Sequence, residues 1–176
     1  KNLREINEVL GHRKALDYIL EYDGDITREF VLQIHKLVME GAAPEGYTDQ
    51  IGQYRNVQVY IRGTDWMPPA PEDVPEDMAS LLSWYSKNKN ELHPLVTAVY
   101  FHVGFEIVHP FIDGNGRVGR LLLNFILHRN GYPMVNIPTE EKQDYYDALV
   151  EAQTDGDMRP FIELIIKLLE ETEVML

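Results

Sequence analysis

The stretch that decides the fold is LVTAVYFHVGFEIV, residues 95–108, followed directly by HPFIDGNGRVGR, residues 109–120. The first part is apolar on nearly all sides, which is typical of a helix at the centre of a domain. Pro94 suits the first position of that helix. The helix must end by His109, because a residue before proline is pushed out of the helical conformation. The sequence therefore predicts a buried central helix that leads into a polar, glycine-rich loop.

Apolar residues at helical spacing predict further helices around this one. In contrast, residues 51–63, IGQYRNVQVYIRG, alternate β-branched and polar side chains, which predicts a small β-hairpin. We expect a mainly α fold with about seven helices and one β-hairpin, forming a single domain over residues 1–176. The predicted helices run from Ile6 to Leu20, from Phe30 to Val38, onward from Pro75, over 95–108, 117–130 and about 140–152, and onward from Pro160.

Composition excludes several classes of protein. The 176 residues include 16 Lys and Arg against 29 Asp and Glu, a net charge of −13, which argues against a nucleic-acid binder. The absence of cysteine excludes disulfides, thiolate metal sites and a cysteine nucleophile. No stretch has the signal-peptide or membrane-spanning pattern, so we expect a cytoplasmic protein with no membrane partner. The chain starts at Lys1 already in helical rhythm, and we interpret it as a piece of a longer protein.

The loop between the central helix and the next one has the composition of a polyphosphate site. Gly114, Asn115 and Gly116 can turn successive backbone N–H groups toward one point at a helix N-terminus, where anions bind. Arg117 and Arg120 are three residues apart on the first turn and project to one side. Two guanidinium groups above such a nest suit a triphosphate.

Two further side chains complete the chemistry. Asp113 is placed to hold a Mg²⁺ ion that bridges phosphate oxygens. His109 lies at the mouth of the same loop, where an imidazole can accept a proton from an attacking hydroxyl near neutral pH. Together these residues predict transfer of a group from a nucleoside triphosphate to a hydroxyl. The competing interpretations are a structural histidine, an aspartate that only caps a helix, and arginines paired with surface carboxylates.

HPFIDGNGRVGR resembles the signature of the Fic (Fic/Doc) family, His-Pro-Phe-x-Asp-Gly-Asn-Gly-Arg-x-x-Arg, at every specified position. Segments on both sides also resemble the family, so the likeness covers nearly the whole chain. It implies a helical core with a β-hairpin flap over the active site. It also implies adenylyl transfer (AMPylation) from ATP to a Ser, Thr or Tyr hydroxyl of a target protein.

The resemblance also assigns roles to residues. His109 is the general base and Asp113 the ligand of Mg²⁺, with Mn²⁺ as an alternative ion. The flap holds the target by strand addition, and Tyr146 is preferred over Tyr145 for the nucleoside pocket. Self-modification and homodimer formation are further expectations. The phosphate-binding residues are Gly114, Asn115, Gly116, Arg117, Gly119 and Arg120; the nucleoside pocket comprises Tyr145, Tyr146 and Gln153; the flap comprises Gln53, Arg55, Val57, Gln58, Val59, Tyr60 and Ile61.

Many Fic proteins carry an inhibitory motif, Ser/Thr-x-x-x-Glu-Gly/Asn, whose glutamate pairs with the second signature arginine, here Arg120. No such motif occurs in this sequence, so we expect it upstream of Lys1 and expect the chain to be de-inhibited. Four alternative functions stay open. They are removal of AMP by the longer protein, phosphotransfer, transfer of another nucleotide or of phosphocholine, and a non-catalytic peptide-binding module. Gly116 favours AMP transfer, because the phosphotransfer branch of the family usually has lysine there.

Overall fold

Helix α4, Pro94–Val108, lies at the centre of the computed structural model, which describes residues 2–61, 64–139 and 142–175. His93 caps its start with a side-chain bond from Leu95 N–H (3.1 Å), and the pyrrolidine of Pro94 occupies the first turn. Helix α5, Asn115–Arg129, runs beside it. The predicted central helix is confirmed, and its C-terminal end leads directly into the loop with the predicted site.

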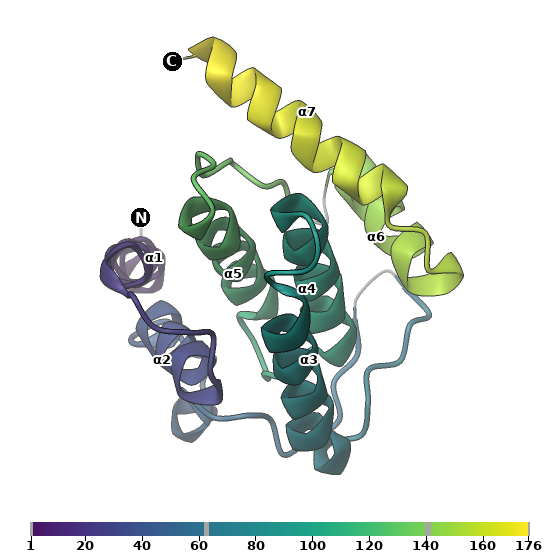
Figure 1. Ribbon diagram of the computed structural model, residues 1–176. Helices are drawn as coiled ribbons and strands as arrows, with labels where there is room; N and C mark the ends of the chain where they lie inside the picture. Colours follow the sequence, from purple (N-terminus) through teal and green to yellow (C-terminus); the bar gives the residue numbers. More distant parts are fainter. Residues whose placement is uncertain (1, 62–63, 140–141, 176) are drawn as a thin grey trace.

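Five more helices surround this pair, so the described residues contain the seven helices expected from the sequence (Figure 1). The helices α1 and α2 pack against each other and against α5, α3 packs along α4, and the hairpin of α6 and α7 covers the remaining face of α4. Their bounds are α1 Leu3–Glu21, α2 Arg28–Met39, α3 Val74–Asn88, α6 Gln143–Asp155 and α7 Arg159–Met175, with 3₁₀ turns at Thr48–Gln50 and Pro71–Asp73.

The core is continuous from α1 to α7, and aromatic side chains join several of its helices. Phe30 and Phe125 are 4.8 Å apart between ring centroids and join α2 to α5. The helix α1 approaches α2 closely at Gly11, where a Cβ atom would lie 2.6 Å from the carbonyl oxygen of Leu37. This close approach fixes α1 against α2.

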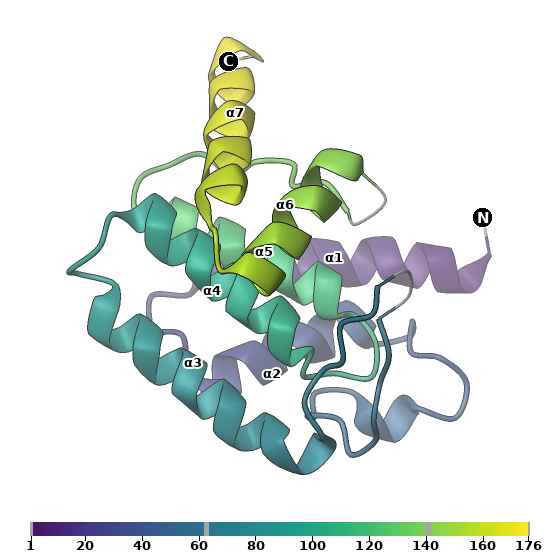
Figure 2. The same cartoon turned by 90° about the vertical axis from the view of Figure 1, so that its right-hand side faces the viewer.

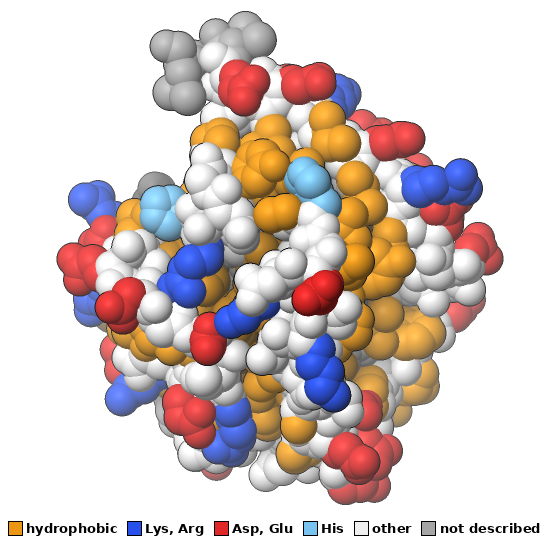
Figure 3. All heavy atoms as spheres, viewed as in Figure 1, with side chains coloured by type: hydrophobic (Ala, Val, Ile, Leu, Met, Phe, Trp, Pro, Cys, Tyr) orange, Lys and Arg blue, Asp and Glu red, His pale blue; other side chains and the backbone are white. Residues whose placement is uncertain are grey.

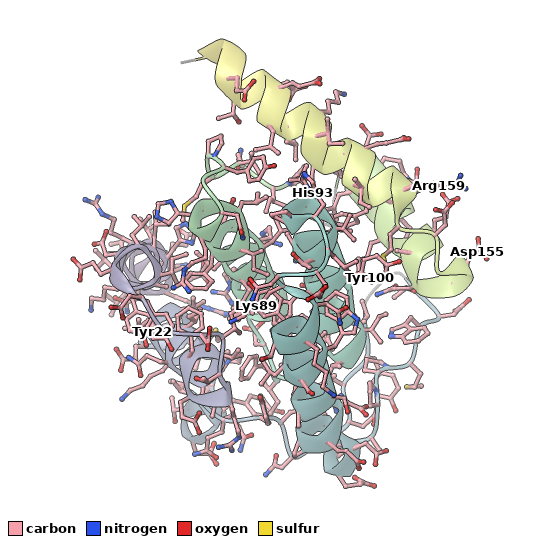
Figure 4. All side chains as sticks on the ribbon, in the orientation of Figure 1. Tyr22, Lys89, His93, Tyr100, Asp155 and Arg159 are labelled. Carbon is pink, nitrogen blue, oxygen red and sulfur yellow. The ribbon has the colours of Figure 1, made fainter. Side chains whose placement is uncertain are left out.

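The connection between α1 and α2 is fastened at the end of the bundle opposite the site. Arg129 donates to the carbonyls of Tyr22 (3.0 Å) and Gly24 (2.8 Å), and Lys89 pairs with Asp25 at 2.6 Å. Figure 4 labels Tyr22 and Lys89 on the two sides of this connection, and Asp155 and Arg159 at the turn between α6 and α7. These contacts join the α1–α2 connection to the ends of α3 and α5. The site lies at the other end of the bundle.

The predicted β-hairpin is not confirmed. We call residues 51–61 the flap and residues 64–70 its return arm; residues 62–63 of the predicted hairpin lie outside the described part, and neither arm contains a strand. Side chains join the arms instead of a backbone ladder: Gln58 donates to the carbonyl of Pro68 (3.0 Å) and Arg55 to that of Pro69 (2.7 Å). The prolines explain the difference, because a proline has no N–H to donate to a ladder.

The surface agrees with the acidic composition. Acidic side chains are spread around the face shown in Figure 3, and basic ones are interspersed with them rather than gathered in one patch. Within the described ranges, no helix is long and apolar enough to cross a bilayer.

Candidate active site

His109 occupies the position where α4 ends, and its backbone is unusual. Its φ and ψ are 50° and 61°, the left-handed region, and it is the only residue other than glycine with positive φ in the described part of the chain. Its N–H still donates to the carbonyl of Phe105 at 2.9 Å, as in a helix. A left-handed conformation costs a non-glycine residue about 1–2 kcal/mol, and such strain concentrates at functional sites.

The chain that follows leads to the start of α5, where the sequence predicts an anion site. Gly114 is the N-cap residue with φ of 85°, and the first helical bond runs from Val118 N–H to its carbonyl at 3.0 Å. The N–H groups of residues 115–117 therefore have no intrahelical acceptor, and they stand at the positive end of the helix dipole. A Cβ at Gly116 would lie 2.9 Å from Nη1 of Arg120, so glycine keeps the space that this guanidinium occupies.

Two residues that the sequence predicts to bind phosphate, Asn115 and Gly119, have structural roles. Asn115 is buried, and its side-chain amide accepts from the N–H of Phe111 (2.8 Å) and donates to the carbonyl of Phe111 (2.7 Å). Only the backbone N–H of Asn115 is left for an anion. Gly119 faces α4, where a Cβ would lie 2.3 Å from Oε1 of Glu106. Asn115 therefore shapes the loop, and Gly119 allows α5 to pack on α4.

Asp113 lies among cations at the entrance of this site. Its Oδ1 accepts from the N–H of Gly114 at 2.9 Å, while Oδ2 faces Arg117 at 3.5 Å and Arg4 of α1 at 3.9 Å. The carboxylate is about one third exposed. Arg4 was not singled out from the sequence, because only the tertiary packing of α1 brings it here.

Helix α1 contributes a second residue, His12, to this charged environment. Partial burial and the positive charges of Arg120 and Arg117 lower the pKa of His12 below its ordinary value. His12 is therefore neutral at pH 7 and lies within electrostatic reach of both signature arginines.

His35 of α2 joins the loop to the flap. Its Nδ1 accepts from the N–H of Gly52 (2.9 Å), so Nε2 carries the proton that donates to the carbonyl of Asp113 (3.0 Å). The ring stacks on Phe111 with 3.8 Å between centroids. Burial lowers the pKa of His35 to about 4, which keeps it neutral in this bridge.

A cavity of about 650 Å³ lies between the return arm and α6. Tyr146 and Gln153, both predicted for the nucleoside pocket, line it together with Trp66, whose Nε1–H donates to the carbonyl of Ile107 at 3.4 Å. The prediction for Tyr145 is wrong: the residue is buried in the core, and its hydroxyl donates to Nε2 of His102 at 2.7 Å. Trp66 was missed, although a tryptophan beside two prolines was a visible signal.

The predicted flap residues divide into two groups. Val57 is 42% and Tyr60 75% exposed, and Gln53 is also exposed, so these side chains are accessible to a partner. Val59 and Ile61 are half-buried. Gln58 turns inward to bridge the two arms, and Arg55 is 2% exposed with its guanidinium directed into the protein. The expectation that Arg55 faces a target is therefore corrected.

The helical core, the left-handed histidine and the glycine-capped loop define a Fic domain. The sequence profile of the Fic/DOC family matches residues 25–127, and the chain belongs to this family.

Particular relatives extend the likeness beyond that range. The chain is 40% identical over 177 residues to a protein adenylyltransferase Fic of Nematostella vectensis and 39% identical over 178 residues to that of Drosophila grimshawi. Each match covers 98% of this chain, but only 40% and 35% of the relatives. The chain thus spans well under half the length of these relatives.

Solved structures show the same fold. Fic-1 of Caenorhabditis elegans, residues 134–508, superposes with a TM-score of 0.81 at 33% identity, covering 98% of this chain and 50% of that one. A Fic domain-containing signalling protein of Bacteroides thetaiotaomicron superposes with a TM-score of 0.85 at 28% identity, covering 96% and 70%.

Proposed function

We propose that this chain is the catalytic domain of a protein adenylyltransferase, which transfers AMP from ATP to a Ser, Thr or Tyr hydroxyl of a target protein. The observation that carries the proposal is the left-handed His109 at the start of a short loop that ends in a glycine-capped helix N-terminus with two arginines. One segment of twelve residues, the loop after α4 and the start of α5, then holds both a proton acceptor and a polyphosphate site. The relatives named protein adenylyltransferase support the same activity.

In this mechanism the target hydroxyl oxygen attacks the α-phosphorus of ATP. A bond forms between that oxygen and phosphorus, the bond to the β-phosphate oxygen breaks, and pyrophosphate leaves. The imidazole of His109 accepts the hydroxyl proton. The N–H groups of residues 115–117 and the guanidinium groups of Arg117 and Arg120 bind the phosphates and stabilise the charge that develops on the leaving pyrophosphate.

The residues present fit a Mg²⁺ ion that arrives with ATP. Mg²⁺ is usually held by one or two carboxylates together with phosphate oxygens and water. Asp113 offers one partly exposed carboxylate oxygen beside the phosphate site, and no cluster of three or more candidate ligands occurs in the described part. The ion would neutralise phosphate charge, and Mn²⁺ suits the same single carboxylate.

The cavity beside α6 is the proposed nucleoside pocket. Its volume lies within the range usual for small-molecule sites. Tyr146 and Trp66 supply aromatic surface for the base, and Gln153 supplies an amide for its polar edge. Trp66 extends the predicted pocket, because it brings the return arm into contact with the same ligand.

The target would lie along the flap. Its described residues form no strand, and Val57 and Tyr60 are exposed, so an added strand would pair with those backbone groups of the flap that have no partner within the chain. Self-modification, a homodimer and a cytoplasmic location are further proposals from the sequence. Removal of AMP would belong to the longer protein, because this chain lacks the inhibitory glutamate motif.

Intact-mass spectrometry after incubation with ATP and Mg²⁺ tests the proposal. A mixture of the chain with candidate acceptor proteins should gain the mass of AMP, on an acceptor or on the chain itself. The His109→Ala variant should bind ATP with little change and produce no adduct. A gain of a bare phosphate would instead support phosphotransfer. Undiminished labelling by His109→Ala would refute the assignment of the base.

A further inference from the structure

The side chain of Arg55 in the flap donates four hydrogen bonds to backbone carbonyls near the site. Its Nε–H donates to the carbonyl of His109 at 2.7 Å, and Nη2 donates to those of Pro69 (2.7 Å) and Val108 (3.2 Å). Its Nη1 donates to the carbonyl of Val57 at 3.0 Å. The side chain is buried, and its partners among the described residues are carbonyls rather than carboxylates.

These contacts supply donors to backbone carbonyls at the end of α4. The last carbonyls of a helix have no intrahelical donor, and they carry the negative end of the helix dipole. The carbonyls of Val108 and His109 are in this position, because the helix ends at Val108 and the residues that would donate to them lie outside it. A buried guanidinium satisfies both carbonyls and places a positive charge at the negative end of the helix. In this way the helix end also compensates for burying the cation.

The same contacts help to hold the strained backbone of His109 in place. On its N-terminal side, the N–H of His109 is bound to Phe105 within α4. On its C-terminal side, Arg55 binds the carbonyl of His109, and the backbone N–H of Arg55 binds the carbonyl of Pro110 at 2.9 Å. A histidine stays in this strained left-handed conformation only where surrounding contacts hold its backbone in place. Arg55 thus supplies two contacts that hold the chain on the C-terminal side of His109.

The guanidinium also sets the separation of the two arms of the flap. Val57 belongs to the flap and Pro69 to the return arm, and Arg55 binds both carbonyls. Figure 2 shows these arms passing beside the loop that joins α4 to α5. The surface proposed for the target and the backbone of the proposed base are therefore held by one side chain.

We propose that Arg55 is a positioning residue for catalysis, which fixes the direction of the His109 imidazole and aligns the flap with it. The inference rests on the proposed function for the role of His109. A lysine cannot replace the guanidinium, because an ammonium group is compact and cannot donate to four carbonyls in a planar fork. A displacement of about 1 Å in a reacting group can lower a rate by about 10²-fold.

The test compares Arg55→Lys with Arg13→Lys, a matched change at a largely exposed arginine of α1. The rate of AMP transfer at saturating ATP is measured well below the Tm of each variant. We expect Arg55→Lys to lose about 10- to 100-fold in kcat, with the Kd of ATP within about twofold of wild type, and Arg13→Lys to match wild type. In an Arg55→Ala variant, ethylguanidinium should restore part of kcat, and ethylammonium should not. An Arg55→Lys variant that is folded and has the wild-type kcat overturns the inference.

A second measurement does not depend on turnover. The Cα and Cβ chemical shifts of His109 report its left-handed backbone, and they should move in Arg55→Lys but not in Arg13→Lys; unchanged shifts overturn the inference. If no Arg55 variant folds, the wild-type protein provides the test. The Nε–H of Arg55 should be protected from solvent exchange, and a rapidly exchanging Nε–H overturns the inference. Lack of AMP transfer by the wild type would refute the proposed function, while the shifts and the exchange still test the role of Arg55.

Discussion

Acidification should destabilise this protein through His102, which lies in the core between α4, α5 and α6. Its Nδ1–H donates to the carbonyl of Gly119 (2.9 Å), and its Nε2 accepts from the hydroxyl of Tyr145 (2.7 Å). Burial, and to a lesser degree the charge of Arg120, lowers the pKa of His102 to about 4, although the bond to Gly119 acts in the opposite direction. The ring is therefore neutral in the folded protein at every pH above about 4.

The magnitude follows from proton linkage. An unfolded histidine has a pKa of about 6.5, so the unfolded chain binds more protons than the folded one between about pH 6.5 and 4, and stability falls as the pH falls through this window. With pKa values of about 6.5 and 4, His102 alone removes about 2 kcal/mol from the free energy of unfolding between pH 7 and pH 5.

The assay is urea unfolding at pH 7, 6 and 5 for wild type, His102→Gln and His128→Gln. Glutamine can keep a polar contact in the core but cannot take up a proton, so the loss of stability on acidification should be about 2 kcal/mol smaller in His102→Gln than in wild type. His128 is exposed, and its variant should have the wild-type profile. Contributions from His35 and the carboxylates occur in all three proteins and cancel. Parallel profiles for wild type and His102→Gln would refute a buried neutral imidazole.

Three further changes test other parts of the site. Gly119→Ala should cost about 1–3 kcal/mol in urea unfolding, since the new Cβ would meet the carboxylate of Glu106; an unchanged midpoint would contradict this packing. The pKa of His12, followed by NMR, should rise when ATP binds, because the phosphates offset the arginine charges that lower it; a constant pKa would place the phosphates elsewhere. Tyr145→Phe should lower stability by about 1 kcal/mol and leave ATP affinity unchanged, whereas Tyr146→Ala should weaken ATP binding in calorimetry; the reverse pattern would exchange their assignments.

The predictions that succeeded depend on local chain chemistry. A helix that is apolar all round has to be buried, and Pro110 has to end it, whatever else the chain does. The helix predicted over 117–130 is present as α5, and it begins two residues earlier than predicted, after Gly114. The end of one helix and the start of the next were therefore largely readable from twelve consecutive residues.

The predictions that were not confirmed concern residues whose positions depend on partners distant in the sequence. Tyr145 and Tyr146 are adjacent in sequence, and only the position of α6 shows that Tyr145 faces His102 while Tyr146 faces the cavity. The alternation of residues 57–61 suits a strand, but its neighbour is a proline-containing arm that cannot complete a ladder. Arg55 resembles a surface residue in sequence, and its buried role needs carbonyls from three separate segments.

The irregular flap also bears on how the protein avoids self-association. VQVYI, residues 57–61, is a short run of β-branched and aromatic residues, the type of segment that pairs edge to edge with other chains when it is exposed as a flat strand. Side-chain donors occupy the carbonyls of Val57 and Val59, and the prolines of the return arm break any extended edge. These features disfavour edge-to-edge pairing of this segment with other copies of the chain.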